Sequence, residues 1–133
     1  MRFAFFWTAV LVGTALLVAT AGAQPSPEWH SCTGEPDVDW DQQIRSCTAL
    51  IQSDRESVHN RAIAYNFRGN SYYAKGDNDR AITDYNEAVR LDPMYESAYV
   101  NRGLSYYVKG DSDLAIAHFR KALQLNPGQI HQQ

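Results

Sequence analysis

The sequence predicts an all-α protein built as a short α-solenoid, which is a stack of antiparallel helix hairpins. Residues 107–127 (YVKGDSDLAIAHFRKALQLNP) restate residues 73–93 (YAKGDNDRAITDYNEAVRLDP) at an offset of 34 positions. A repeat of this length indicates stacked units that bury a shared core. In the aligned windows 62–95 and 96–129, 16 of the 34 positions are identical, so the units share one structure.

Each unit contains the local signals of two helices and the turn between them. In the first unit, residues 61–94, the spacing of apolar residues predicts one helix from 61 to 74 and a second that ends at 91. Gly76 suits the position after a helix end, Asp77 is a suitable N-cap, and Pro93 ends the unit. The second unit, residues 95–128, repeats these signals at Gly110, Asp111 and Pro127, and a tail of residues 129–133 follows.

Small and aromatic side chains alternate within both units. Small residues let two helix backbones approach closely, and aromatic rings fill the space that is left. The small set is Gly69, Ala81 and Ala88 with Gly103, Ala115 and Ala122, and the aromatic set is Tyr65, Tyr72 and Tyr85 with Tyr99, Tyr106 and Phe119.

Upstream of the units, the sequence predicts an extended leader over residues 24–37 and one helix with a loop over residues 38–60. The leader holds three prolines and Gly34, which disfavour a helix. In the next segment, apolar residues recur at three- and four-residue steps, which indicates a helix from about 39 to 53. These residues are Trp40, Ile44, Cys47, Leu50 and Ile51.

Residues 1–23 are predicted to be a signal peptide. Arg2 gives a positive start, residues 3–19 carry no charge, and residues 21–23 (Ala-Gly-Ala) form a small-residue cleavage site. We expect cleavage after Ala23 and a protein that is exported, periplasmic or secreted. The alternative is an uncleaved membrane anchor, since about 17 apolar residues lie near the lower limit for spanning a bilayer.

The charge of the chain gives no sign of nucleic-acid binding. The sequence has 12 basic and 15 acidic residues, and the basic ones are dispersed rather than gathered in a stripe.

The two cysteines, Cys32 and Cys47, both lie in the exported part of the chain. An even number in an oxidising compartment predicts an intramolecular disulfide, which would stabilise the fold by about 3 kcal/mol in the loop-entropy model. Free thiols and an intermolecular bridge are the alternatives.

The spacing Tyr65-x2-Arg68-Gly69-x2-Tyr72, followed by Ala81, Tyr85, Ala88 and Pro93, resembles the tetratricopeptide repeat (TPR) signature, and the second unit matches it equally. The resemblance covers residues 62–127, so residues 61–94 and 95–128 are TPR 1 and TPR 2. Residues 38–60 resemble the second half of a degenerate repeat, and WHSCTG … QQIRSCTALIQS is similar to small exported bacterial TPR proteins. The resemblance implies protein binding.

Both units place arginine, Arg68 and Arg102, where TPR proteins usually carry leucine. A buried arginine needs a partner, so we expect these side chains to reach solvent or a carboxylate such as Asp84.

No catalytic, cofactor or metal site is predicted. The histidines, His30, His59, His118 and His131, do not share a helix at metal-binding spacing. The paired acids Asp77/Asp79 and Asp111/Asp113 begin helices, where carboxylates favour the helix dipole. The chain is therefore not expected to be an enzyme.

TPR geometry implies that the first helix of each hairpin lines a concave face suited to an extended peptide. The alternative is ordinary helix surface. A known TPR mode that grips a C-terminal carboxylate is incomplete, because Asn66 stands at the first lysine position and a third repeat is absent. The expected groove residues are Ile63, Asn66, Asn70, Tyr73, Val100, Asn101, Leu104 and Tyr107.

The last helix supports a second hypothesis, an assembly module. Its apolar residues spread over roughly 200° of the helical wheel, which is wider than a helix with one buried side needs. We expect no further helix to cover this face, because only a short tail follows. The face, centred on Ala122, Leu123 and Leu125, would dock on a partner subunit or on a second copy in a homo-oligomer.

Overall fold

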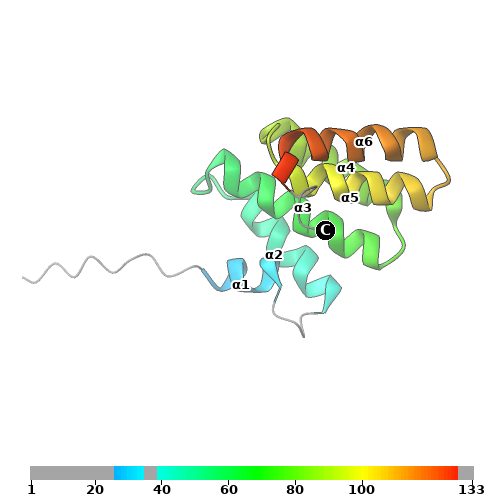
Figure 1. Ribbon diagram of the computed structural model, residues 1–133. Helices are drawn as coiled ribbons and strands as arrows, with labels where there is room; N and C mark the ends of the chain where they lie inside the picture. Colours follow the sequence, from blue (N-terminus) through cyan, green and yellow to red (C-terminus); the bar gives the residue numbers. More distant parts are fainter. Residues whose placement is uncertain (1–25, 35–38, 129–133) are drawn as a thin grey trace, which may run out of the picture.

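The computed structural model describes residues 26–34 and 39–128, which form six helices and no strand (Figure 1). The predicted all-α fold class is confirmed. The predicted signal peptide and the tail of residues 129–133 lie outside the described residues. In the described part, no helix is long and apolar enough to cross a membrane. The helices are α1 (Pro27–Thr33), α2 (Trp40–Gln52), α3 (Val58–Ala74), α4 (Asn78–Leu91), α5 (Glu96–Val108) and α6 (Ser112–Leu125).

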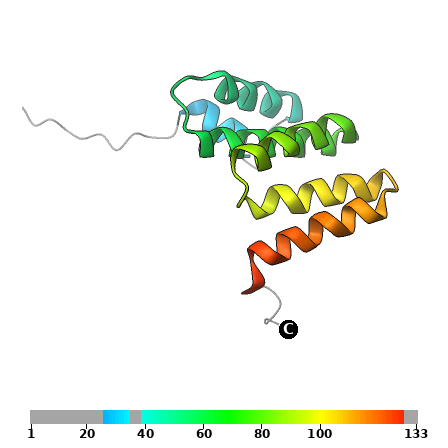
Figure 2. The same ribbon diagram turned by 90° about the horizontal axis from the view of Figure 1, so that it is seen from above.

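The helices pair into three stacked hairpins, α1–α2, α3–α4 and α5–α6. Seen from above in Figure 2, α3 and α4 lie between the N-terminal pair and the α5–α6 pair. The two TPR-like hairpins turn as predicted: Gly76 and Gly110 have φ of 80° and 87°. Asp77 accepts a hydrogen bond from the backbone N–H of Arg80, and Asp111 caps α6 in the same way. Local chemistry therefore defines both hairpins.

The prediction of an extended leader is wrong for residues 27–33, which form helix α1. Proline is compatible with the first turn of a helix, and Pro27 stands there, while Gly34 with φ of 90° follows the helix end. A helix of seven residues is unstable alone, so its packing against α2 must hold it. The N-terminal segment is consequently a complete hairpin with a short first helix, and not half of one.

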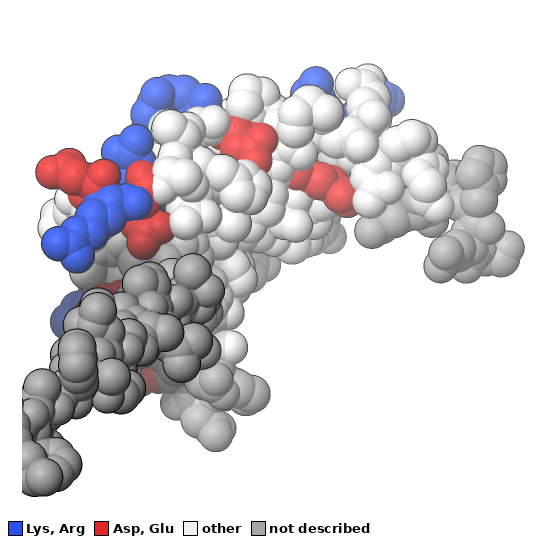
Figure 3. Space-filling model, turned by 90° about the vertical axis from the view of Figure 1, so that its left-hand side faces the viewer, with Lys and Arg blue, Asp and Glu red and all other residues white. Residues whose placement is uncertain are grey.

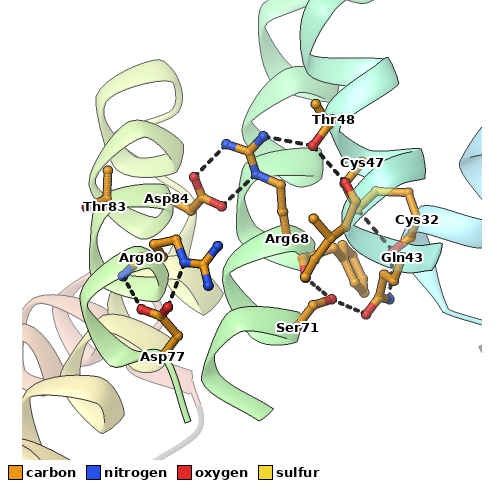
Figure 4. Close-up of polar contacts among 12 residues, drawn as sticks. Cys32, Gln43, Cys47, Thr48, Arg68, Ser71, Asp77, Arg80, Thr83 and Asp84 are labelled. Atoms are coloured by element: carbon orange, nitrogen blue, oxygen red, sulfur yellow. Dashed lines mark hydrogen bonds and ion pairs between the residues drawn. A yellow bond between two sulfur atoms is a disulfide. The ribbon is translucent and has the colours of Figure 1, made fainter. Parts of the chain in front are cut away.

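A disulfide fixes α1 on α2. The Sγ atoms of Cys32 and Cys47 are 2.17 Å apart, and both residues are fully buried beside Leu50 and Ala64. This is the intramolecular pairing that the sequence predicts. The buried Gln43 extends the junction: its Nε2 donates to the Cys32 carbonyl at 2.8 Å, and its Oε1 accepts from Ser71 Oγ at 2.5 Å (Figure 4). Three helices therefore meet at this amide.

Within each TPR-like hairpin, an aromatic ring lies directly on a glycine. A Cβ atom added at Gly69 would lie 2.6 Å from the Tyr85 ring, and one at Gly103 would lie 2.7 Å from the Phe119 ring. Cβ atoms essentially never approach another atom this closely, so a larger residue at either glycine would force the ring or the helices to shift. The alternation of small and aromatic residues thus sets the distance between the paired helices.

Arg68 joins three helices by its guanidinium, as Figure 4 shows. Its Nε and Nη2 donate to the two carboxylate oxygens of Asp84 on α4, each at 2.8 Å, and its Nη1 donates to Thr48 on α2 at 2.9 Å. The predicted pairing with Asp84 is confirmed. The bond to Asp84 raises the pKa of Arg68, and two parallel charge-assisted hydrogen bonds make this contact directional.

The corresponding Arg102 lacks a carboxylate. Its Nη1 donates to Asn86 on α4 at 2.7 Å, and its Nη2 lies 3.0 Å from Nδ1 of His118, which occupies the repeat position of Asp84. Its buried Nε has no hydrogen-bond partner among the described residues. Burial and then the charge of Arg102 lower the pKa of His118, because a protonated ring would oppose the guanidinium.

This geometry makes the stability of the last hairpin depend on pH. The folded state holds the pKa of His118 below its ordinary value of 6.5, so the unfolded chain takes up the proton first as pH falls. The contribution of neutral His118 to the free energy of unfolding is complete at pH values above this ordinary pKa. It is lost as the pH falls below it and His118 becomes protonated. We expect His118→Asp to remove this loss and to raise the free energy of unfolding by roughly 1 kcal/mol.

Urea unfolding at several values between about pH 7.5 and pH 5 measures this difference. His30→Gln is the control, since it leaves Arg102 and its neighbours unchanged. An His118→Asp protein that loses as much stability in acid as the wild type would contradict the assignment.

Candidate functional site

The first helices of the hairpins line the inner side of a curved stack. Helix α3 contacts both α1 and α5, whereas α2, α4 and α6 make no contact with one another. Because the first helices approach each other more closely than the second helices do, the stack bends with α1, α3 and α5 inside. Figure 3 shows the molecule arched around a hollow, and the wall visible in that view carries few charged side chains.

Most predicted groove residues of α3 and α5 reach this inner side. Five of them, including Asn70, Tyr73 and Asn101, are partly exposed, and Leu104 and Tyr107 are 40% and 65% exposed. A pocket of about 200 Å³ opens where the two helices meet. Its lining residues are Asn70, Tyr73, Asn101 and Leu104, together with Tyr85, which the sequence assigned only to the core.

The amides of the predicted groove bond to one another. Asn101 Nδ2 donates to Oδ1 of both Asn66 and Asn70 at 3.0 Å. Tyr85 donates its hydroxyl hydrogen to Asn70 Oδ1 at 2.8 Å, and burial raises the pKa of this phenol, so it stays a donor. The floor of the groove is thus a fixed polar network, and its walls are aromatic and aliphatic.

The prediction that Asn66 contacts a partner in the groove is wrong. It is only 3% exposed, and its Nδ2 donates to the Tyr95 hydroxyl at 3.2 Å. Its side chain supports the network from below and does not offer an amide to a partner.

The sequence missed a second pocket on the same inner side, between α1 and α3. It has a volume of about 470 Å³. Of its residues, only Ile63 was predicted, because the α1 residues were assigned to an extended leader. The helical spacing of Trp29 and Thr33, four positions apart, could have revealed it. The lining residues are Trp29, His30 and Thr33 of α1 and Asn60 and Ile63 of α3.

The predicted C-terminal docking face also needs a correction. Ala122 is 3% exposed and faces the interior, and Leu125 is half-buried. Leu123 is 47% exposed, and Ile116 is 49% exposed, whereas Ile82 at the same repeat position of α4 is 8% exposed. The difference arises because α5 packs on α4 and no described helix packs on the outer side of α6.

The remaining polar features fit structural roles. Lys75 pairs with Asp41, and Lys109 pairs with Asp79, so each ion pair joins the turn of one hairpin to the previous hairpin. These exposed pairs contribute little stability. No group of three or more His, Cys, Asp or Glu residues that could hold a metal ion occurs in the part of the chain that the structure describes.

Comparisons with protein families identify the repeats. A TPR repeat model matches residues 69–110, and a tetratricopeptide repeat model matches residues 97–129. Residues 69–129 of this chain therefore match tetratricopeptide repeat models. Its TPR frame accounts for the matched spacing of Gly69, Tyr85 and Pro93 with their counterparts 34 positions later. No curated protein matches the chain.

Several solved structures share this fold. The second TPR of Spaghetti (RPAP3) bound to the HSP90 peptide SRMEEVD matches with a TM-score of 0.60 and 24% identity, over 65% of this chain and 77% of that one. Two crystal structures of MamA match with TM-scores of 0.60 and 0.58, at 30% and 29% identity, over 68% and 71% of this chain. This chain spans about half of the MamA chains, 51% and 49%.

The hydrogen-bond network of the groove predicts effects of different size for substitutions of a buried and an exposed side chain. Asn66→Ala leaves the Asn101 amide with one acceptor fewer and Tyr95 without its donor, so we expect a loss of about 1–3 kcal/mol in the free energy of unfolding. Leu104→Ala, at a partly exposed position, should change it by less than about 0.5 kcal/mol. Urea unfolding of both variants checks this, and equal losses would contradict the assigned roles.

Proposed function

We propose that the protein is a non-enzymatic interaction module whose inner face binds an extended segment of another protein. The observation that carries the proposal is the pocket between α3 and α5, which has a fixed polar floor and the exposed Leu104 in its lining. Tyr107, three positions further along α5, is also exposed. Such a surface suits a peptide, since apolar contacts hold side chains while the groove is already formed. The RPAP3 TPR, which is bound to a peptide, supports this mode.

The chemistry of the groove favours an uncharged segment. The peptide bound to the RPAP3 TPR, SRMEEVD, contains three acidic residues. The lining residues of the two inner pockets include no lysine or arginine. The asparagine at the first lysine position of the carboxylate-binding mode, Asn66, is buried. An acidic peptide would therefore lose hydration without gaining an ion pair.

We also propose that the protein acts in the bacterial cell envelope, after export, in the periplasm or outside the cell. The signal-peptide pattern of residues 1–23 supports export. The buried Cys32–Cys47 disulfide supports an oxidising compartment. Contact with a membrane follows only if residues 1–23 stay attached.

Substitution of the groove tyrosines tests the proposal. For a peptide selected from a random display library on the wild-type protein, we expect Tyr73→Ala and Tyr107→Ala each to weaken binding at least about tenfold. Calorimetry measures the affinity. Trp40→Ala is the matched control, since Trp40 is an exposed aromatic residue on α2, a second helix. Unchanged affinity in both tyrosine variants would contradict the proposed groove.

The exposed face of α6 favours a second candidate function, self-association with another copy. Ile116 and Leu123 lie seven positions apart on one stripe of the helix, and Asp113 and Arg120 flank that stripe. Two α6 helices related by a two-fold axis perpendicular to them would run antiparallel. That arrangement can place each Asp113 beside the Arg120 of the other copy, which supports an isologous contact.

For this second candidate, we expect a concentration-dependent dimer that Ile116→Asp or Leu123→Asp converts to monomer, because either carboxylate would be buried without a partner. Light scattering at tens of micromolar measures the mass. Val58→Asp, on an exposed valine of α3, is the control. If the wild-type protein is strictly monomeric, self-association is excluded, and the proposal that the groove binds a peptide is unaffected.

A further inference from the structure

The pocket between α1 and α3 has walls of aromatic and aliphatic carbon. Trp29 contributes its indole ring from α1, and Ile63 contributes its side chain from α3. His30, Thr33 and Asn60 complete the lining, and none of the five residues is acidic, lysine or arginine. The volume of about 470 Å³ can accommodate a bulky side chain.

The polar atoms of these walls are largely occupied. Trp29 Nε1 donates to Glu56 Oε1 at 3.0 Å, and Asn60 Nδ2 donates to Glu56 Oε2 at 2.7 Å. The hydroxyl of Thr33 donates to the Trp29 carbonyl at 2.8 Å. The Glu56 carboxylate therefore accepts hydrogen bonds from both walls of the pocket. What the lining residues offer an incoming side chain is mainly apolar surface, and none of them is an acid, a lysine or an arginine that could pair with a charged group.

The disulfide holds one of the two walls. Helix α1 is too short to be stable alone, and it is attached to the folded stack through Cys32–Cys47 and through the Gln43 bond to the Cys32 carbonyl. Without the covalent bond, a seven-residue helix would have to stay ordered by packing and hydrogen bonds alone. In that state we expect Trp29 to move away from Ile63 and the pocket to be lost.

The two inner pockets are spaced for one extended segment. Along α3, Asn60 and Ile63 line one pocket, and Asn70 and Tyr73, each ten positions later, line the other. Ten residues of helix correspond to about 15 Å. An extended chain covers roughly 3.3 Å per residue, so side chains in the two pockets would lie about four or five residues apart.

We propose that the α1–α3 pocket anchors one bulky apolar side chain, such as leucine or phenylalanine, of the bound segment, and that the Cys32–Cys47 disulfide is what forms this anchor. The proposal rests on the proposed function, since the rest of the segment would lie in the α3–α5 groove. It names an apolar side chain as a second point of contact, outside the α3–α5 groove. This contact requires that Cys32 and Cys47 are oxidised to the disulfide.

Single-residue probes test the anchor without a partner peptide. N-acetyl-leucinamide and N-acetyl-phenylalaninamide are titrated into the oxidised protein, with N-acetyl-lysinamide and N-acetyl-aspartic acid amide as charged comparators. NMR follows the indole N–H of Trp29 and the side-chain amide of Asn60. We expect saturable shifts with the two apolar probes, with dissociation constants on the order of millimolar, and none with the charged ones.

Two variants complete the test. Ile63→Ser should weaken the apolar probes about tenfold, while Val58→Ser, on the same helix but outside the pocket, should leave them within about twofold. Cys32→Ser with Cys47→Ser should abolish the shifts while the α3–α6 resonances keep their positions. If those resonances also collapse, reduction of the wild-type protein at low temperature provides the same comparison.

Equal shifts with all four probes, or binding that survives loss of the disulfide, would overturn the proposal. These results are independent of the groove tyrosines. If Tyr73→Ala and Tyr107→Ala fail to weaken peptide binding while the apolar probes still bind at Trp29, the proposed groove is wrong and the anchor stands. If the tyrosine substitutions weaken peptide binding but the apolar probes do not bind at Trp29, the proposed anchor is wrong and the groove stands.

Discussion

The Tyr85 ring packs directly on Gly69, and the Phe119 ring packs on Gly103 in the same way, and these two contacts set the geometry of both hairpins. The ring occupies the place where any other residue would carry Cβ, so the two helices of each hairpin meet at one fixed distance and register. The same ring donates its hydroxyl hydrogen to Asn70 on the inner side. One aromatic residue thereby connects hairpin packing to the floor of the groove.

The hairpins are then joined by polar contacts that repeat with the sequence. Arg68 joins α2, α3 and α4 through Thr48 and Asp84, and Arg102 makes the corresponding contacts with Asn86 and His118. The substitution of histidine for the carboxylate leaves the last hairpin with the weaker junction. The Arg68 junction lies in the middle of the stack, where α3 takes part in both inner pockets.

The features that depend on residues close together in the chain could be predicted from the sequence. Gly76, Asp77 and their counterparts define turns through backbone preferences that any environment would keep, and the pairing of Arg68 with Asp84 follows from their facing positions in one hairpin. Helix α1 was missed because Pro27 and Gly34 are read locally as helix breakers, whereas tertiary packing decides the state of so short a segment.

The groove was predictable in outline but not in detail. The repeat frame indicates which stripe of α3 and α5 faces inward, and most of the predicted residues reach it. It does not show that Asn66 lies beneath Asn101 and Tyr95, because that burial depends on partners about 30 positions away in the chain. Ala122 was misplaced for a similar reason, since a small side chain on a broad apolar face packs inward.

One inner face, formed by α1, α3 and α5, is proposed to receive an extended segment. Hydrogen exchange of the oxidised protein, with and without a peptide selected on it, tests this most directly. Binding should slow exchange in residues 27–33, 58–74 and 96–108 and leave residues 112–125 unchanged. Protection confined to α4 or α6 would contradict the account, because those helices lie on the outer side of the stack.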